Sequence, residues 1–484
     1  MSMVRRLAPA AATSVLVAIA LDLIYGPWFL NYDARYALLW AQDLANGHAP
    51  EYKADFAPTP HPLQTAFGLL ALPFGAASDD VLVFATLLAF GALVYLAFAL
   101  GRELFSPWVG VVAALVVLTR PAMQRDALLA YQDVPFAALV VGAVLAEARR
   151  LKRADATPPA SSGTGGTLVL ALLAVAGLLR PEAWVLSGLY VLWIWRDRDN
   201  GGRARAVALA AAAPLIWAAS DWAVTGDPLH SLHGTADLAI ANDRRRSVAD
   251  VPYWSAQYFG YALREPLVLG IPIGLVFAWR YARRQSYLPL AVVAAMVAVF
   301  AIGPIFGLPL IRRYIATPAV LLTLFYGLAV AGCLMLPPGR ARTGWTAVAA
   351  FSVLLSIAYL PWHYDLLRTV ERRLDRDGVL YGDLQEAMEA PQVRAAFEAC
   401  PELTAGDHRP MPFARFWLDG APGTVSTVEG DASPMGKLLL MPVKGPTTSR
   451  IYPPKVFPKV ETPEDFTTIY ANRSWRVSAA PGCV

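Results

Sequence analysis

Long apolar segments follow one another from residue 7 to residue 361 and constrain the fold more than any other feature of this chain. Short polar loops separate them, and 56% of the 484 residues are hydrophobic while only 16% are charged. Soluble globular proteins carry roughly 25% charged residues, so most of this chain is suited to lipid rather than to water. The net charge of +4 is too small to indicate nucleic-acid binding. We therefore expect an all-α polytopic membrane protein.

The apolar segments predict about eleven transmembrane helices. We place them near residues 7–30, 81–100, 107–118, 135–146, 168–180, 183–195, 206–222, 265–279, 288–303, 314–336 and 345–361. Another apolar segment, 63–74, would cover only roughly 18 Å as a helix, too short for a hydrocarbon core of about 30 Å. We expect that segment to lie in the outer interface. The stretch 147–167 is basic and then rich in Gly, Ser and Pro, which is typical of a flexible linker.

The chain divides at residue 361 by composition. Residues 1–361 form the predicted membrane domain, and residues 362–484 are polar enough for a small soluble domain of mixed α/β structure. Eleven crossings place the N-terminus in the cytoplasm and this second domain outside the plasma membrane. The excess of Lys and Arg in the predicted inner loops agrees with that orientation.

Two of the three cysteines, Cys400 and Cys483, lie in the predicted outer domain. An even pair in an extracytoplasmic domain favours a disulfide, and closing so long a loop would contribute about 4 kcal/mol in the chain-entropy model. Two buried thiols are the alternative. Cys333 lies inside a predicted helix, where a small core residue is the simplest interpretation.

The first predicted outer loop, residues 31–62, carries charges directly beside a membrane helix. Charged groups are costly to place there and indicate a functional site. Asp33 lies at the membrane boundary, where a half-buried carboxylate can act as a general base toward a hydroxyl. A helix cap or a simple interfacial acid is the alternative for Asp33. Asp133 and Glu182 are further acids on the same predicted side of the membrane.

Cations on the same side predict recognition of a lipid phosphate or pyrophosphate. They are Arg35, Lys53, Arg312 and Arg313. Arginine matches phosphate oxygens bidentately, whereas ordinary interfacial anchoring is the alternative role. His230 and His233 have an i, i+3 spacing, but the flanking proline and glycine favour a loop, so no metal site is predicted.

Several short motifs follow one another in a particular order over roughly the first 320 residues. They are Asp33, Arg35-Tyr36, the Gly-x-x-Pro-x-Tyr stretch Gly47–Tyr52, the proline-rich Pro58–Pro62, Arg180-Pro181-Glu182, Thr225–Leu229 and Arg312-Arg313-Tyr314. In this order and membrane placement the chain resembles the integral-membrane glycosyltransferases of the GT-C fold. These include protein O-mannosyltransferases, the lipid A aminoarabinose transferase and actinobacterial mannosyl- and arabinosyltransferases.

The resemblance implies a sugar donor linked to polyprenyl phosphate and a glycan, lipid or protein acceptor in contact with membrane lipids. It implies that Asp33 deprotonates the acceptor hydroxyl in an inverting reaction and that the cations bind the donor phosphate. Many relatives carry an acid directly after the aspartate, where this chain has Ala34. Asp133 and Glu182 are therefore expected to supply that helper. The reaction requires no cofactor, although a divalent metal could assist it.

A transporter or flippase for a lipid-linked or amphipathic solute is the alternative function. Such a protein would use the cations on the outer side to bind its solute and would catalyse no reaction. The sequence shows no paired halves with matching broken helices, the pattern of inverted-repeat transporters.

Overall fold

The computed structural model describes residues 3–26, 29–156, 166–429 and 435–483. The membrane domain contains α1 (Met3–Tyr25), α2 (Tyr32–Ala45), α3 (Pro62–Ala71), η1 (Leu72–Ala77), α4 (Ser78–Leu104), α5 (Pro107–Leu118), α6 (Pro121–Leu128), α7 (Asp133–Ala156), α8 (Thr167–Gly177), α9 (Glu182–Ile194), η2 (Trp195–Asp197), α10 (Asn200–Thr225), α11 (His230–Ala241), η3 (Val248–Asp250), α12 (Val251–Leu263), α13 (Leu267–Tyr281), α14 (Arg283–Ile302), η4 (Gly303–Phe306), η5 (Arg312–Ile315), α15 (Ala316–Ala331), η6 (Gly332–Met335) and α16 (Arg340–Ala358). The C-terminal part contains α17 (Leu360–Glu389), α18 (Pro391–Ala399), β1 (Leu403–Ala405), α19 (Met411–Trp417), β2 (Val425–Thr427), β3 (Leu438–Pro442), β4 (Thr467–Ala471) and β5 (Trp475–Ala479).

The chain is a multi-pass membrane protein. In the described residues, six helices are long and apolar enough to cross a bilayer, and the number rises to eight if two bent pairs are each one span. The bent pairs are α5 with α6, at 59°, and η3–α12 with α13, at 98°. The expected count of eleven is not confirmed. Two of the expected spans, α8 and α9, have only 11 and 13 residues.

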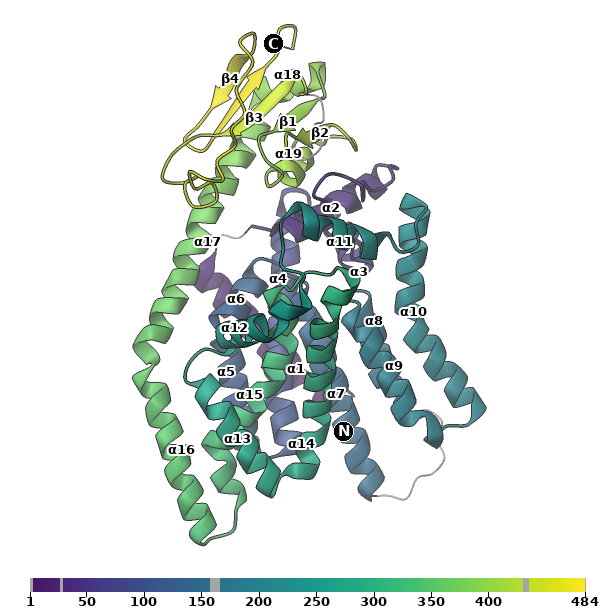
Figure 1. The fold of residues 1–484 in the computed structure, drawn as a ribbon, viewed down its shortest axis with the longest axis vertical. Helices are drawn as coiled ribbons and strands as arrows, with labels where there is room; N and C mark the ends of the chain where they lie inside the picture. Colours follow the sequence, from purple (N-terminus) through teal and green to yellow (C-terminus); the bar gives the residue numbers. More distant parts are fainter. Residues whose placement is uncertain (1–2, 27–28, 157–165, 430–434, 484) are drawn as a thin grey trace.

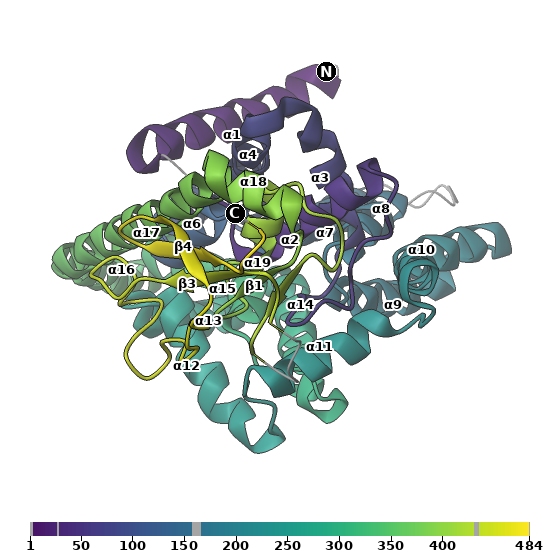
Figure 2. The ribbon, with the colours of Figure 1, turned by 90° about the horizontal axis from the view of Figure 1, so that it is seen from above.

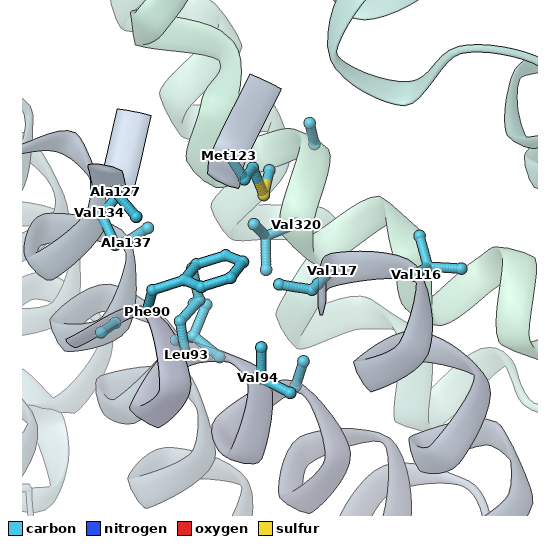
Figure 3. Packing of buried hydrophobic residues seen from close by; sticks show 14 of the residues in the cluster. Phe90, Leu93, Val94, Val116, Val117, Met123, Ala127, Val134, Ala137 and Val320 are labelled. Carbon is cyan, nitrogen blue, oxygen red and sulfur yellow. The ribbon is translucent and has the colours of Figure 1, made fainter. Parts of the chain in front are cut away.

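The membrane core is built around α4, which packs against α1, α5 and α7. Phe90 of α4 is fully buried and points toward Val117 of α5 and Val320 of α15, with Met123 of α6 nearby (Figure 3). The crossing of α13 and α15 depends on Gly274, where an added Cβ would lie 1.6 Å from the carbonyl oxygen of Phe325. Small residues of this kind let membrane helices approach closely.

The segment 31–62 is only partly a loop, so that expectation is wrong for residues 32–45, which form α2. Asn31 caps this helix, because its side-chain oxygen accepts hydrogen bonds from the backbone N–H groups of Asp33 and Ala34 at 2.8 and 3.2 Å. Asparagine is among the best N-cap residues. The apolar segment expected at 63–74 forms α3 and the beginning of η1.

A five-stranded sheet organises the C-terminal part, in the order β2-β1-β3-β5-β4. The strand β1 pairs in parallel with β2 and β3, whereas β5 pairs antiparallel with β3 and β4. This is the mixed α/β domain that the sequence analysis expected. Cys400, directly after α18, and Cys483 are joined by a disulfide, with their Cα atoms 5.7 Å apart.

The helix α17 belongs to both parts of the molecule. Val370 and Leu374 are buried in the core of the membrane domain, whereas Leu380 and Leu384 are buried in the core of the sheet domain. Figure 1 shows this helix rising from the end of α16 to the sheet domain. The expected boundary at residue 361 lies one residue after the start of α17, but the second core begins at Leu380, nearly two turns beyond Leu374.

We expect the Cys400→Ser/Cys483→Ser variant to lose about 4 kcal/mol of sheet-domain stability, because the disulfide closes a loop across 83 positions. Thermal unfolding of the purified protein measures the loss, and Cys333→Ala serves as the control. Maleimide labelling of intact cells should leave Cys400 and Cys483 unmodified until a reductant is added. Labelling of both residues without reductant would contradict the pairing.

Candidate active site

A continuous row of alternating charges lies where α2, α7, α9 and η5 meet. We call it the ionic chain; it consists of Asp33, Arg313, Asp133, Arg180 and Glu182. Nη2 of Arg313 lies 2.9 Å from Oδ2 of Asp33, and Nη1 lies 3.5 Å from Oδ2 of Asp133. Arg180 pairs with Asp133 and, at 2.6 Å, with Glu182. Four of the residues singled out from the sequence are thus brought together, although they are up to 280 positions apart.

Local sequence places each carboxylate of the ionic chain at the beginning of a helix. Asp33 is in the first turn of α2, Asp133 begins α7 and Glu182 begins α9. Carboxylates are stabilised there by the helix dipole and by free backbone N–H groups. The side chain of Asn31 also donates to the carbonyl oxygen of Leu129, which ties the start of α2 to the end of α6.

The ionic chain is most deeply buried at its centre, Asp133, and most exposed at Asp33. The side chain of Asp133 is 3% exposed, whereas that of Asp33 is 22% exposed. Burial lowers the pKa of Arg180, but Asp133 and Glu182 outweigh it and raise the pKa above its usual value. Arg180 therefore stays charged. Asp33 is the most exposed of the three carboxylates of the row, at 22% against 11% for Glu182, and is therefore the one that a substrate reaches most easily.

His61 lies near Arg180 and Asp133, the buried members of the ionic chain. Burial, with a smaller contribution from the nearby Arg180, lowers the pKa of His61 to about 3. The imidazole is therefore neutral at pH 7. It can orient a polar group by hydrogen bonding, but it carries no positive charge for a phosphate.

Two of the predicted phosphate ligands, Arg35 and Lys53, lie away from the ionic chain. Arg35 is fully buried, pairs with Asp79 of α4, and its guanidinium lies 4.7–5.0 Å from three aromatic rings of α19. These rings belong to Phe413, Phe416 and Trp417. Lys53 is exposed and donates to the carbonyl oxygen of Thr225 at 3.0 Å. Neither cation joins the ionic chain.

The sheet domain holds α2 through a second buried arginine. Arg415 of α19 pairs with Asp43 of α2 and, at 2.9 Å, with Glu51. Burial raises the pKa of Asp43, and Arg415 opposes that shift. In the view from above, α19 lies over α2 (Figure 2). These ion pairs thus fix α2, the helix that carries Asp33, against the sheet domain.

Further cations lie near the ionic chain: Arg312, which was predicted to bind phosphate, and Arg125 and Arg264, which were not singled out from the sequence. The guanidiniums of Arg312 and Arg264 lie 3.9 and 5.0 Å from the ring centre of Tyr261. Arg125 of α6 lies 5.8 Å from the ring of Tyr131, and Arg313 lies 4.3 Å from the same ring. We call Arg264 and Arg312 the arginine pair. The sequence did contain a signal for Arg125 and Arg264, because each is a charged residue that interrupts apolar residues.

An apolar cavity lies beneath the ionic chain, nearer the other end of the bundle. Its volume is about 960 Å³, and its walls come mainly from α7, α8, α9 and α14. Val140, Leu173, Leu186 and Leu288 are among the residues that line it. Two of these helices, α7 and α9, carry Asp133 and Glu182 at their first residues. The cavity and the charged site therefore share the same helices.

The described part of the chain contains no group of three or more His, Cys, Asp or Glu side chains that could hold a metal ion. The carboxylates of the ionic chain are paired with arginines instead. Assistance by a divalent metal stays an expectation from the sequence resemblance.

Comparison with known proteins gives fold relatives only. No protein-family profile matches the chain, and neither does any curated protein. Among solved structures, ArnT from Cupriavidus metallidurans bound to undecaprenyl phosphate is similar over 99% of this chain and 98% of its own, with a TM-score of 0.57 and 14% identity.

The oligosaccharyltransferase of Archaeoglobus fulgidus in the apo form is similar over 87% of this chain, with a TM-score of 0.54 and 13% identity. The archaeal oligosaccharyltransferase AglB from Archaeoglobus fulgidus, in complex with an inhibitory peptide and a dolichol-phosphate, is similar over 87% of this chain and 65% of its own, with a TM-score of 0.52 and 12% identity. The matched region spans only 64% of the apo oligosaccharyltransferase chain. The chain thus has the fold of these structures, the GT-C fold that the sequence motifs implied.

Proposed function

We propose that this protein transfers a sugar from a polyprenyl-phosphate donor to an acceptor hydroxyl on the outer face of the membrane. One observation carries the proposal: the accessible carboxylate of Asp33 is held by Arg313 at 2.9 Å beside further arginines. A base for the acceptor and cations for a phosphate are the two requirements of this reaction. The GT-C fold supports the same assignment.

Asp33 acts as the general base. The acceptor oxygen attacks the anomeric carbon and its proton passes to Asp33, while the bond from that carbon to the phosphate oxygen breaks on the opposite side. The anomeric configuration is inverted. Arg313 orients the carboxylate, and the 22% exposure of the Asp33 side chain leaves room for the hydroxyl.

The arginine pair receives the donor phosphate. A phosphate leaving group needs positive charge rather than a proton, and guanidiniums bind its oxygens bidentately. Arg313 is already engaged by Asp33 and Asp133, so we assign the phosphate to Arg312 and Arg264. The positions of Arg35 and Lys53 favour structural roles for both.

Asp133 and Glu182 are positioning residues in this mechanism. They neutralise the buried Arg180, and Asp133 also meets Arg313 at 3.5 Å. The guanidinium of Arg313 is thereby fixed between Asp33 and Asp133. No proton transfer through either acid is needed.

The apolar cavity suits the prenyl chain of the donor. A chain anchored by its phosphate at the arginine pair would run down the bundle toward walls of Val and Leu. Figure 1 shows the N-terminus toward the end of the bundle away from the sheet domain. We accordingly place the N-terminus in the cytoplasm and the sheet domain outside.

Asp33→Asn should lower transfer by at least about 100-fold while leaving the fold intact, because the amide cannot accept the acceptor proton. A strain lacking the gene would be rescued with wild type or variant, and its lipid-linked sugars and envelope glycans quantified by mass spectrometry. A polyprenyl-phosphate sugar should accumulate as one glycan linkage disappears.

The matched control for this experiment is Asp55→Asn, which removes an exposed acid of the same outer segment. It should rescue fully. Full rescue by Asp33→Asn as well would reject the transferase mechanism and bring the transporter function forward.

Arg264→Gln should lower kcat/KM for the lipid donor by about 100-fold, since removing one donor to a developing oxyanion costs about that much. The control is Arg246→Gln, an exposed arginine of the preceding loop. Initial rates at varied donor concentration measure the effect. Equal rates for the Arg264→Gln and Arg246→Gln variants would show that Arg264 does not bind the donor phosphate.

Arg180→Gln should destabilise the protein by about 3–5 kcal/mol, because Asp133 and Glu182 would be left without their buried counter-charge. A fall in Tm measures this effect. Adding Asp133→Asn to the same protein should restore part of the loss. A double variant that unfolds at a still lower temperature would show that the two side chains act independently.

A further inference from the structure

The two bent helix pairs of the membrane domain meet at one buried side chain, that of Arg120. The first bend lies between α5 and α6, where Arg120 directly precedes α6. The second lies between α12 and α13, and Leu263 is the last residue of α12. Nη1 of Arg120 donates to the carbonyl oxygen of Leu263 at 2.7 Å. Figure 1 shows α6 beside α12 and α17. One hydrogen bond therefore joins the two bends.

Arg120 is a buried cation without a carboxylate partner. The residue is 5% exposed, and it forms no ion pair within the part of the chain that the structure describes. Its other contact runs from Nη2 to Nδ1 of His363 on α17, at 3.4 Å, and its buried Nε has no hydrogen-bond partner among the described residues. Arginine stays protonated in proteins, and buried cations are normally paired. A charge held at this cost inside a membrane domain indicates function.

The carbonyl group that Arg120 holds lies directly before Arg264, a member of the arginine pair. The last carbonyl groups of a helix have no partner within that helix, and a break inside a membrane domain must find partners elsewhere. Arg120 supplies one from a different helix pair. The chain then turns by 98° between α12 and α13. The hydrogen bond from Arg120 is thus placed where it fixes the start of this turn.

The backbone of Arg264 is strained. Its φ is 56° and its ψ is 170°, a combination that is rare for any residue except glycine. Such a conformation persists only where the surrounding structure fixes it. The N–H group of Arg264 donates to the carbonyl oxygen of Gly260 at 2.9 Å, while Arg120 holds the carbonyl group of Leu263. Both polar groups of the peptide unit between Leu263 and Arg264 are therefore fixed.

This peptide unit determines where the Arg264 side chain points. The guanidinium of Arg264 lies 5.0 Å from the ring centre of Tyr261, and that of Arg312 lies 3.9 Å from the same centre. Rotation of the peptide unit would move Arg264 away from Arg312. A guanidinium that is already held in its bound position loses less freedom on binding, which strengthens its affinity for a ligand.

Resting on the proposed function, we infer that Arg120 is a positioning residue of the donor phosphate site. It acts through the peptide unit between Leu263 and Arg264 and does not contact the donor. By joining the bends of two helix pairs, it holds the Arg264 guanidinium beside Arg312, where both can bind the phosphate.

Farnesyl phosphate, a soluble prenyl phosphate, titrated calorimetrically into the full-length protein in phosphatidylcholine nanodiscs tests this role. Arg120→Met leaves no carboxylate unpaired, so the protein should stay folded. Its Kd for farnesyl phosphate should rise by at least about tenfold, the loss expected for one hydrogen bond to a charged group. Arg120→Lys keeps a charged donor and should return the Kd to within about threefold of wild type. An unchanged Kd in Arg120→Met, or no recovery in Arg120→Lys, would overturn the inference.

His363→Leu tests the same guanidinium through its second contact, and it decides the matter should Arg120→Met not fold. Loss of the contact at 3.4 Å should loosen Arg120 and raise the Kd for farnesyl phosphate by about threefold. A Kd equal to that of wild type would contradict the role of Arg120.

The matched control is Gln124→Leu, which removes another buried polar side chain near the bend between α5 and α6. Nε2 of Gln124 donates to the carbonyl oxygen of Leu118 at 2.7 Å, and its Oε1 accepts from the hydroxyl of Tyr25 at 3.1 Å. Neither partner belongs to α12. This variant should lower Tm but bind farnesyl phosphate as wild type does. An equal rise in Kd for Gln124→Leu and Arg120→Met would show a general loosening of the bend and overturn the inference.

A double-variant cycle separates this inference from the proposed donor site. If Arg120 acts through Arg264, Arg120→Met/Arg264→Gln should bind farnesyl phosphate no more weakly than Arg264→Gln alone. Additive losses would overturn that route. Weaker binding by Arg264→Gln with none of the loss in Arg120→Met would reject the role of Arg120 alone. An unchanged Kd in Arg264→Gln would reject the donor phosphate site itself, and the role of Arg120 with it.

Discussion

The ionic chain is the interaction on which the rest of the structure depends. Its five charged side chains connect α2, α7, α9 and η5, which lie far apart in the sequence. Buried ions are tolerated only when they are paired, and removing one partner costs about 3–5 kcal/mol. Each pair therefore specifies one arrangement of the helices. The same arrangement leaves Asp33 as the accessible end of the row.

The sheet domain completes the site from the other side. Arg35 and Arg415 are both buried at the contact of α2 with α19, and each has a carboxylate partner in the membrane domain. The aromatic rings of α19 surround the Arg35 guanidinium, an arrangement that favours a buried cation. The helix of Asp33 is fixed from the membrane core through Asp79 and from the sheet domain through Arg415.

Sequence patterns predicted the candidate site better than the helices that carry it. Asp33, Asp133, Glu182 and Arg313 could be found because each is a charge beside an apolar segment, at the same side of the membrane. Arg35 could not be placed, since the segment was expected to be a loop. In a helix, residues two positions apart point about 200° apart, so Arg35 faces away from Asp33.

The expected helix count is not confirmed, and the reason is different. Segments such as α8 and α9 are apolar throughout but shorter than a bilayer, and their place in the bundle is set by tertiary packing that composition does not encode. Arg125 and Arg264 escaped notice although each is a charge beside apolar residues and the ring that it contacts, Tyr131 or Tyr261, lies only six or three positions away.

The continuity of α17 sets the height of the site above the bilayer. Its 30 residues extend over about 45 Å without a break, with one end packed in the membrane core and the other in the sheet core. A rod of this kind fixes the distance from the hydrocarbon region to the sheet domain. In a membrane of different thickness, the protein would then tilt or the surrounding lipid would deform, at a cost of a fraction of a kcal/mol per Å of mismatch. Bilayer thickness thereby becomes a determinant of how deeply a lipid-borne headgroup sits relative to Asp33.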